Sequence, residues 1–516
     1  MALSPVDWII IATYLVGCVV AGVWMKRYVR GVDDFAVAGR EMDLNLGIAS
    51  LAATEFGIAT VMYTAELGFK NGLAGAIPGV LECLAFLVVG ITGFVIVPLR
   101  DANVITIPEL FEKRFGTRVR WLAGLVVVLG GVLNMGIFLR LGGEFLVHIT
   151  GISPQYLELT MTVLLGIVLF YTVMGGMLSV LITDYIQFLV MGLGVVIASV
   201  LVVWSIGWSN LLSGLWEAHE ASVGAAATDS PAGPMVMPDP FNPLSSCGWG
   251  WMIWQAMLLL AGAVTWQTCI ARVLSAKNAG IAKQVYRRTS FFFVGRFALP
   301  GLWGAAAFVY FWSSGGLPEG VDTRSAMPAY MSTVLPCGII GILMAAMLAA
   351  EMSTDSGYLL TWATVIYNDL IMPCLRRPIS AKARLLIVRS LVVAIGLFLV
   401  FYGLWYEIPG RAWDYMAITA TIYLASVFTL LVGVLYWRGA NRWGAYAALV
   451  LGAVGPITFL LVNVDGKERI APEVAGLSAF GLSFAGMFFG SLAGRWLGPG
   501  DAGPAPNAPV IEEEKP

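Results

Sequence analysis

Charged side chains are scarce in this sequence, and so are the residue types that build metal sites and disulfides. Only 12% of the 516 residues are charged, two are histidine and six are cysteine, and the formal net charge is −2. A charge this close to zero provides no basic surface for a nucleic acid. The cysteines have no paired spacing, so neither a disulfide framework nor a zinc site is indicated. No nucleophile–base pair and no P-loop motif stands out, so the sequence does not indicate an enzyme.

Long apolar runs are what the sequence has in abundance. Hydrophobic residues make up 59% of the chain, and a run of about 20 such residues is long enough to span a bilayer. No basic residue precedes the first run, which argues against a cleaved signal peptide and favours a retained helix. We therefore predict an all-α integral membrane protein with about 13 spans. These spans lie roughly at residues 7–26, 45–68, 75–98, 121–148, 155–174, 179–206, 249–271, 290–313, 337–368, 387–405, 413–436, 443–463 and 476–495.

Lysine and arginine gather in alternate connections between the predicted spans. The rich connections lie within residues 26–40, 100–120, 272–288 and 376–389, and the third of them begins at Arg272. Basic connections face the cytoplasm as a rule. We therefore expect a multi-pass protein of the cell membrane, with its N-terminus outside and its C-terminus in the cytoplasm.

Two predicted spans, 45–68 and 249–271, carry glycine and polar residues at mid-depth. In the first, Gly57 closely follows Thr54-Glu55, and in the second, Gly262 is followed by polar residues as far as Gln267. The two spans are five positions apart in the order of spans and run in opposite predicted directions. This pattern is typical of inverted five-helix repeats, whose interrupted helices expose backbone carbonyls near the membrane midplane.

The apolar segment 337–371 contains two acids and three hydroxyls within residues 351–356. Polar side chains at membrane depth are costly and usually face a cavity, a partner or an ion path. At helical spacing Ala350, Ser353 and Thr354 share one face, and hydroxyl and backbone oxygens suit a hard cation. The alternative is that these hydroxyls bond back to their own helix and bend it.

Other polar and aromatic residues in the spans have simpler interpretations. Arg140 and Glu144 are four residues apart on one helix, so we expect a structural ion pair. Glu55 lies in a broken span, where either a functional role or hydrogen bonding at the break would account for it. Trp413 lies at a span end, where an interfacial aromatic belt is the expected environment.

Four stretches together resemble the sodium:solute symporter family. Each stretch is short, but their order and spacing across about the first 440 residues are specific. The stretches are Ala38-Gly39-Arg40; Pro108-Glu109-Leu110 with Arg114-Phe115-Gly116; Gly175-Gly176 with Thr183-Asp184-Tyr185-Ile186-Gln187; and Ala349-Ala350-Glu351-Met352-Ser353-Thr354.

The resemblance implies a leucine-transporter-like fold with two inverted five-helix repeats, in which the first and sixth core helices are broken. We expect the first repeat at 45–206 and the second at 249–436, joined by an extracellular loop at 207–248. One helix and a cytoplasmic loop would precede the core at 1–44, and two helices would follow it at 437–497. The tail 498–516 is rich in proline, alanine and glycine, and we expect it to be disordered.

The resemblance also implies secondary active uptake of a small solute, with Na⁺ as the coupling ion. By motif, the implied sodium ligands are the backbone carbonyls of Ala53, Phe56 and Ala350 and the hydroxyls of Ser353 and Thr354. Some family members have a second sodium, which Asp184, Asp355 and Ser356 could hold here. Glu55, Glu351 and Asp355 depart from the family's usual residues. These extra carboxylates could strengthen cation binding or bind a cationic substrate, or one of them could titrate, so proton coupling remains an alternative.

The solute itself is not determined by the sequence. Glu82 and Arg296 align weakly with sugar-contacting residues of the family, and Arg296 could instead clamp a carboxylate or be neutralised by Glu82. Sugar, amino acid, carboxylate and vitamin all stay open, and so do a sensor and a channel built on the same bundle. We expect a monomer that contacts the lipid bilayer. The remaining pocket candidates are Glu55, Gln255, Trp266, Gln267, Thr419 and Thr421.

Overall fold

The computed structural model describes residues 3–25, 40–227, 235–375, 379–405, 412–463 and 469–496. Within these ranges the chain is helical, and its only strand-like feature is an isolated bridge between Met42 and Ala276. The first half contains α1 (Pro5–Met25), α3 (Leu44–Glu55), α4 (Ile58–Asn71), the 3-10 turn η3 (Gly72–Ala76), α5 (Ile77–Thr92), α6 (Ile96–Asp101), α7 (Ile107–Phe115), α8 (Thr117–Met135), α9 (Phe138–Thr150) and α10 (Leu157–Ile206). The second half contains α11 (Trp208–Ala227), α12 (Pro243–Cys247), α13 (Trp249–Thr265), α14 (Gln267–Ser275), α15 (Ala279–Ser313), α16 (Ala326–Val334), α17 (Ile339–Val365), α18 (Ala381–Trp405), α19 (Ala412–Tyr436), α20 (Arg442–Val462) and α21 (Pro472–Trp496).

Eleven segments of the described chain are long and apolar enough to cross a membrane. Three of them join consecutive α-helices, α4 with α5 in Ile58–Thr92, α8 with α9 in Thr117–Thr150 and α13 with α14 in Trp249–Ser275, and α1 adds a shorter apolar helix, Pro5–Ala21. Helices are the expected solution because a bilayer offers no partner for a free backbone amide or carbonyl. The predicted all-α membrane class is confirmed, whereas the exact number of 13 spans stays a prediction.

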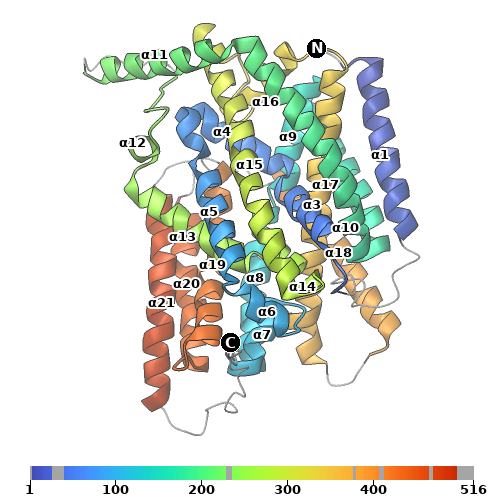
Figure 1. Ribbon diagram of the computed structural model, residues 1–516, viewed down its shortest axis with the longest axis vertical. Helices are drawn as coiled ribbons and strands as arrows, with labels where there is room; N and C mark the ends of the chain where they lie inside the picture. The colour runs from blue at the N-terminus through green and yellow to red at the C-terminus, as the bar shows by residue number, and fades with distance from the viewer. Residues whose placement is uncertain are drawn as a thin grey trace, which may run out of the picture.

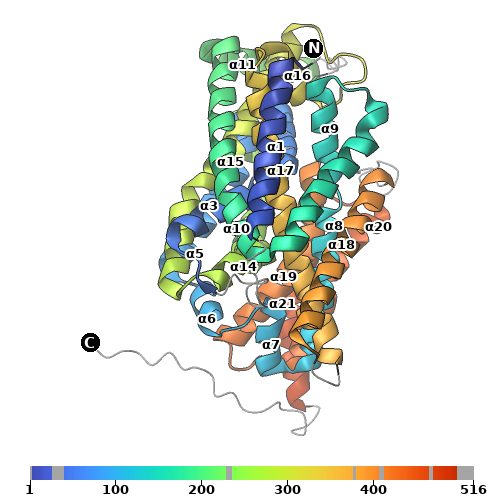
Figure 2. The ribbon, with the colours of Figure 1, turned by 90° about the vertical axis from the view of Figure 1, so that its right-hand side faces the viewer.

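Helix α17 forms the centre of the bundle. Its apolar window is 89% buried, compared with 28% for that of α18, so α17 is surrounded by protein rather than lipid. It packs against α10, α1, α3 and α18. Figures 1 and 2 show α1 beside α10 and α17 on one side of the molecule, and α20 and α21 together on the opposite side.

Helix α10 contains two spans joined at Gly176. This glycine has φ 56° and ψ −155°, a backbone conformation that side chains with a Cβ rarely adopt. The apolar segments on either side are Leu157–Met174 and Ser179–Ile206, which match the predicted spans 155–174 and 179–206.

The connection 207–248 is more helical than the expected loop. Helix α11 occupies Trp208–Ala227, and α12 follows at Pro243–Cys247. Leu211, Leu215 and Ala218 are buried where α11 packs on α15, so a spaced apolar face stabilises the helix. The stretch 228–234, the basic loop 26–39 and the tail 498–516 lie outside the described residues.

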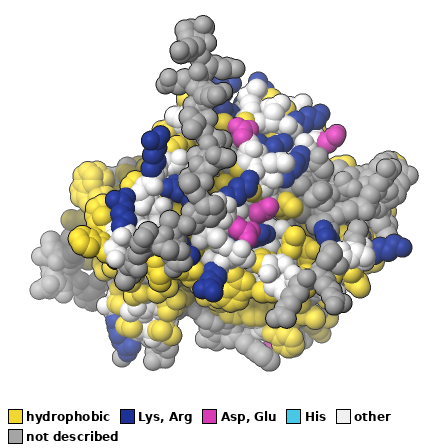
Figure 3. All heavy atoms as spheres, turned by 90° about the horizontal axis from the view of Figure 1, so that it is seen from below, with side chains coloured by type: hydrophobic (Ala, Val, Ile, Leu, Met, Phe, Trp, Pro, Cys, Tyr) yellow, Lys and Arg dark blue, Asp and Glu magenta, His cyan; other side chains and the backbone are white. Residues whose placement is uncertain are grey.

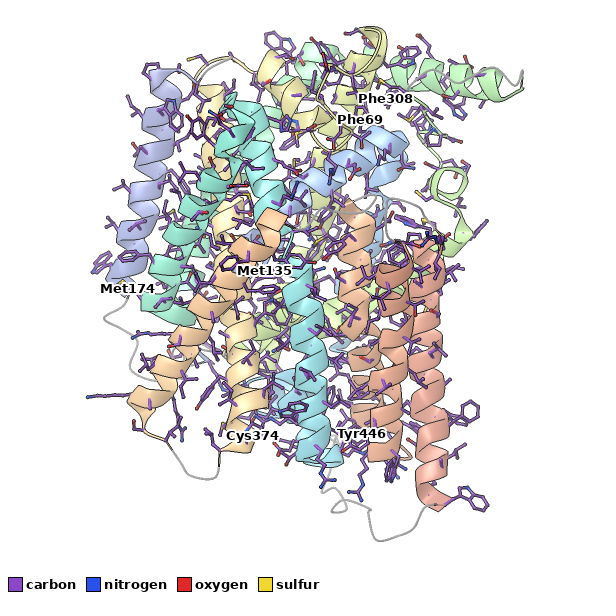
Figure 4. All side chains as sticks on the ribbon, turned by 180° about the vertical axis from the view of Figure 1, so that it is seen from behind. Phe69, Met135, Met174, Phe308, Cys374 and Tyr446 are labelled. Carbon is purple, nitrogen blue, oxygen red and sulfur yellow. The ribbon has the colours of Figure 1, made fainter. Side chains whose placement is uncertain are left out.

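One end of the molecule is rich in lysine and arginine. Figure 3 views the end that carries α6 and α7, and its described surface shows many Lys and Arg side chains and few Asp and Glu. Cys374, which follows α17, also lies at this lower end (Figure 4). A basic end is consistent with the predicted cytoplasmic side, and the orientation of the termini stays a prediction.

Candidate functional site

The first broken helix is interrupted between α3 and α4. Phe56 leaves the helical conformation, with φ −113° and ψ 60°, and its amide donates a hydrogen bond to the Ala53 carbonyl at 3.3 Å. Gly57 then allows a close approach, because a Cβ there would lie 2.7 Å from the Thr354 hydroxyl oxygen. The interruption therefore lies directly against α17.

Two side chains of α17 satisfy the backbone on either side of this break. The Thr354 hydroxyl donates to the Thr54 carbonyl at 2.8 Å, and the Ile58 amide donates to the Glu351 carboxylate at 3.2 Å. A carbonyl at a helix end and an amide at a helix start lack helical partners, so both need partners from elsewhere. Glu351, whose role the sequence left open, thus accepts a hydrogen bond at the start of α4.

Ser353 lies beside the same break, although its hydroxyl has a partner that was not expected for it. Ser353 donates to Asp184 Oδ1 at 2.5 Å, while Ser50 of α3 donates to Asp184 Oδ2 at 2.5 Å. Ala350 and Ser353 are fully buried. The structure thus brings Ser353 and Thr354 of α17 beside the last turn of α3. The carbonyl and hydroxyl oxygens there suit Na⁺, and the Asp184 carboxylate lies next to them.

Arg272 is buried in the bundle, so the prediction that it faces the cytoplasm is wrong. The predicted cytoplasmic connection began at this residue, but it lies within α14 and only 1% of it is exposed. Its guanidinium donates to Asp184 at 3.2 Å, to the Thr54 hydroxyl at 2.5 Å and to the Ser50 hydroxyl at 3.1 Å. An arginine near a span end has the same local pattern whether it faces water or a buried carboxylate, so the sequence held no signal for this contact.

The candidates for a second cation site are not all brought together. The Ser356 hydroxyl donates to the Ser353 carbonyl at 3.1 Å, a bond within its own helix. Asp355 is buried and its Oδ2 has no hydrogen-bond partner among the described residues. The side chains that donate to Asp184 are those of Ser50, Thr54, Arg272 and Ser353. Both oxygens of Asp184 are already hydrogen-bonded, and Arg272 supplies a positive charge beside them.

A cavity lies next to the two helix breaks. Its volume, measured as the space open to the centre of a water molecule, is about 90 Å³. Glu55, Glu82, Trp266 and Arg296, four of the predicted pocket residues, line it. Described residues that complete the wall are Thr54, Gly57, Ala59, Thr60, Tyr63, Phe86, Asn134, Phe138, Leu258, Leu259, Gly262, Cys269, Thr354, Tyr358, Trp413, Met416, Ala417, Ala420 and Leu424.

Three other pocket candidates, Gln255, Gln267 and Thr419, are buried but are not part of this wall. Thr419 lies behind it, because the Asn134 amide that lines the cavity donates to the Thr419 hydroxyl at 3.1 Å. The Thr421 hydroxyl donates to a carbonyl of its own helix. Sequence position alone cannot show which face of these helices meets the cavity.

Arg296 and Glu82 form a two-pronged ion pair in the cavity wall. Arg296 Nη1 donates to both Glu82 oxygens, at 2.9 and 2.8 Å, and Nη2 donates to the Tyr63 hydroxyl at 3.1 Å. Arg296 Nη2 is 3.9 Å from Glu55 Oε2. The geometry corresponds to the alternative in which Glu82 neutralises the arginine.

The second break is marked by Trp266, which separates α13 from α14 with φ −63° and ψ 110°. Its indole donates to the Tyr358 hydroxyl at 2.9 Å and its ring stacks on Tyr423.

Trp413 was expected in an interfacial belt, but it is buried in the cavity wall and packs on Tyr63, with ring centroids 4.9 Å apart. The expected pair Arg140–Glu144 is present, at 3.2 Å.

Comparisons with known proteins agree with this arrangement. A model of the sodium:solute symporter family matches residues 35–452, a range that contains all four motif stretches. The chain is 25% identical over 504 residues to the sodium/glucose cotransporter 4 of Danio rerio, covering 90% of this chain and 73% of that protein. It is 26% identical over 454 residues to the high-affinity choline transporter 1 of Torpedo marmorata, covering 84% and 70%.

A solved structure shares the fold. A Na⁺-coupled sialic acid symporter in a substrate-bound, outward-open state superposes with a TM-score of 0.77, covering 95% of this chain and 98% of that one at 19% identity. The family model matches about four fifths of the chain, which confirms the resemblance of its motifs. This chain therefore belongs to the sodium:solute symporter family.

Proposed function

We propose that this protein takes up one small organic solute through the cavity between its broken helices and couples the uptake to inward movement of Na⁺. The observation that carries the proposal is the contact of the Thr354 hydroxyl with the Thr54 carbonyl at 2.8 Å, where α17 meets the break. Unpaired carbonyls of an interrupted helix and hydroxyls of a facing helix can surround a dehydrated monovalent cation. The family is one of transporters rather than enzymes, and Na⁺ is its coupling ion.

In this proposal Na⁺ is held by the carbonyls of Ala53, Phe56 and Ala350 and by the hydroxyls of Ser353 and Thr354. Binding would require Ser353 to turn from Asp184 toward the ion, which leaves Asp184 to its contacts with Ser50 and Arg272. Sodium would then link α17 to the first broken helix beside the solute cavity. Na⁺ would therefore bind more tightly to the state in which this link is formed, and its binding would shift the equilibrium between the states that open and close the cavity.

The sodium site is tested by removing its two hydroxyls. Ser353→Ala combined with Thr354→Ala is expected to raise the Na⁺ concentration for half-maximal uptake by about tenfold or more, since a hydrogen bond or oxygen contact to a charged group contributes about 1.5–3 kcal/mol. The matched control is Thr364→Ala, which removes a buried hydroxyl of α17 that only bonds to its own helix. An unchanged Na⁺ requirement in the double variant would remove these residues from the site.

Counterflow in proteoliposomes separates the transporter from its alternatives. A symporter accumulates solute against a gradient when Na⁺ is higher outside, a channel only dissipates the gradient, and a sensor binds without flux.

We propose a monomer with its N-terminus outside and its C-terminus in the cytoplasm. The relatives named above are described for sugar, choline and sialic acid, so their names do not select one solute class for this chain.

A further inference from the structure

The cavity wall carries an excess of negative charge. Two carboxylates, Glu55 and Glu82, and one guanidinium, Arg296, line it, and each of the three residues is more than nine-tenths buried. They come from α3, α5 and α15. No other Lys, Arg, Asp, Glu or His is among the described residues of the wall. The wall therefore has a formal charge of −1.

Arg296 is poorly placed to bind an anionic solute. Both Glu82 oxygens accept hydrogen bonds from its Nη1, and its Nη2 donates to the hydroxyls of Tyr63, at 3.1 Å, and Thr60, at 3.4 Å. Only its Nε lacks a hydrogen-bond partner. A two-pronged bond to a carboxylate needs two adjacent free N–H donors. In Arg296 both Nη1 and Nη2 already donate to protein groups, so its free Nε has no free neighbour.

Glu55 is the carboxylate whose charge is left over. Its Oε1 accepts hydrogen bonds from the Thr268 hydroxyl at 3.0 Å and the Cys269 thiol at 3.3 Å, both neutral groups. Its Oε2 lies 3.9 Å from Arg296, beyond hydrogen-bonding distance, while Glu82 is at 2.8 Å from the same guanidinium. A buried charge without a full partner is unfavourable, so a positive group in the cavity would be strongly favoured.

The rest of the wall suits a positive group with an apolar shell. Aromatic faces attract cations, and ammonium groups are commonly held between several rings. Several hydroxyl and amide donors of the wall already have partners within the protein, since Thr60 donates to the Glu55 carbonyl, Thr354 to the Thr54 carbonyl and Asn134 to the Met416 carbonyl. The aromatic residues of the wall are Tyr63, Phe86, Phe138, Trp266, Tyr358 and Trp413.

We infer that the solute of this transporter is a small organic cation, whose positively charged nitrogen lies between Glu55 and the aromatic side chains of the cavity. The inference rests on the proposed function and adds the class of solute. Sodium and the solute would then both be positive, with Na⁺ surrounded by neutral oxygens and the solute paired with a carboxylate. This division keeps the two sites chemically distinct.

The test uses two probes that differ only in charge. Choline serves as the cation, and its uncharged carbon isostere, in which a tert-butyl group replaces the trimethylammonium group, serves as the neutral match; glucose and propionate represent neutral and anionic solutes. Thermal unfolding of the full-length protein in detergent with Na⁺ reports binding, because a ligand stabilises the state that binds it. We expect choline to raise the unfolding temperature and the isostere, glucose and propionate to leave it unchanged.

A response to glucose or propionate without one to choline would overturn the inference, and so would an equal response to choline and its isostere or no response to choline. The wild-type comparison needs no variant, so it stands even if a variant fails to fold. Glu55→Gln is expected to weaken choline binding by about tenfold or more, the loss of one charge contact, while Glu158→Gln, at an exposed glutamate of α10, is expected to leave it unchanged.

Failure of this inference can be told from failure of the sodium site. Na⁺ alone, compared with K⁺ at equal ionic strength, is expected to stabilise the protein, and that shift should disappear in the Ser353→Ala and Thr354→Ala double variant. If the Na⁺ shift is present and choline has no effect, only the solute class is wrong. If Na⁺ has no effect, the sodium proposal fails whatever the probes do.

Discussion

Asp184 and Arg272 show how a single ion pair can join several helices in the interior of the bundle. The pair connects α10 with α14, and through Ser50 and Thr54 it also reaches α3. Both side chains are at most 1% exposed. Burying two charges is unfavourable unless each has its partner, so this contact fixes how α14 packs against the first broken helix.

The pair can be tested with a double-mutant cycle. Removing one partner leaves a buried uncompensated charge and is expected to cost about 3–5 kcal/mol of unfolding free energy. Asp184→Ala and Arg272→Ala should each be strongly destabilising, and the double variant should lose much less than the sum of the two, which measures their coupling. Unfolding monitored in detergent supplies the three values. Additive losses would mean that the two residues act independently.

At the scale of helices, the crossing of α4 and α15 depends on glycine. A Cβ at Gly304 would lie 1.8 Å from the Ala65 carbonyl oxygen, and a Cβ at Gly68 would lie 1.9 Å from the Gly301 carbonyl oxygen. Helices in a bilayer are not held together by the hydrophobic effect, and small residues allow them to approach closely enough for van der Waals packing. Phe69 and Phe308 pack on each other at the upper end of the same crossing, with ring centroids 5.3 Å apart (Figure 4).

Gly304→Ala is therefore expected to destabilise the protein, because backbone atoms cannot rotate away as a side chain can. Overpacking of this kind typically costs about 1–3 kcal/mol, and the unfolding temperature in detergent should fall. Gly295→Ala is the matched control in the same helix, since nothing lies within 4 Å of its added Cβ. There, alanine's higher helix propensity should leave stability unchanged or slightly raised. Equal behaviour of the two variants would show that the crossing can relax.

For the whole molecule, two native cysteines report the orientation in the membrane. Cys337 and Cys374 are both exposed and lie at opposite ends of the segment that contains α17. Ile339–Val365 has 27 residues, and a helix of that length spans about 40 Å at 1.5 Å per residue, more than the hydrocarbon core of a bilayer. The two thiols should therefore face different compartments.

With the N-terminus outside, a membrane-impermeant thiol reagent applied to intact cells should label Cys337 and spare Cys374. Permeabilising the membrane should then expose Cys374. Cys337→Ser and Cys374→Ser assign each labelled site, and each change replaces one exposed sulfur with oxygen. Serine at 337 can still donate to the Ser4 hydroxyl, as the Cys337 thiol does. Labelling of Cys374 alone in intact cells would reverse the predicted orientation.

The sequence by itself determined the class of protein, the approximate helices and the places where two of them break. These follow from local causes: apolar runs of membrane length, glycine beside polar residues at mid-depth, and short motifs such as Ala350–Thr354. The predicted pocket residues Glu55, Glu82, Trp266 and Arg296 do line the cavity, because polar or aromatic groups inside a span need an internal environment. Their part in binding the solute stays a prediction.

Only the tertiary structure decided which partner each buried group has. From the sequence, Arg272 was predicted to be cytoplasmic and Trp413 to lie in an aromatic belt, and Asn134 was not predicted to be a site residue. Nothing in the local sequence distinguishes a side chain that contacts lipid or water from one that contacts a distant helix. The pairing of Arg296 with Glu82 joins residues 214 positions apart. Such contacts depend on how helices pack in three dimensions, and it is this packing that leaves Glu55 without a full positive partner.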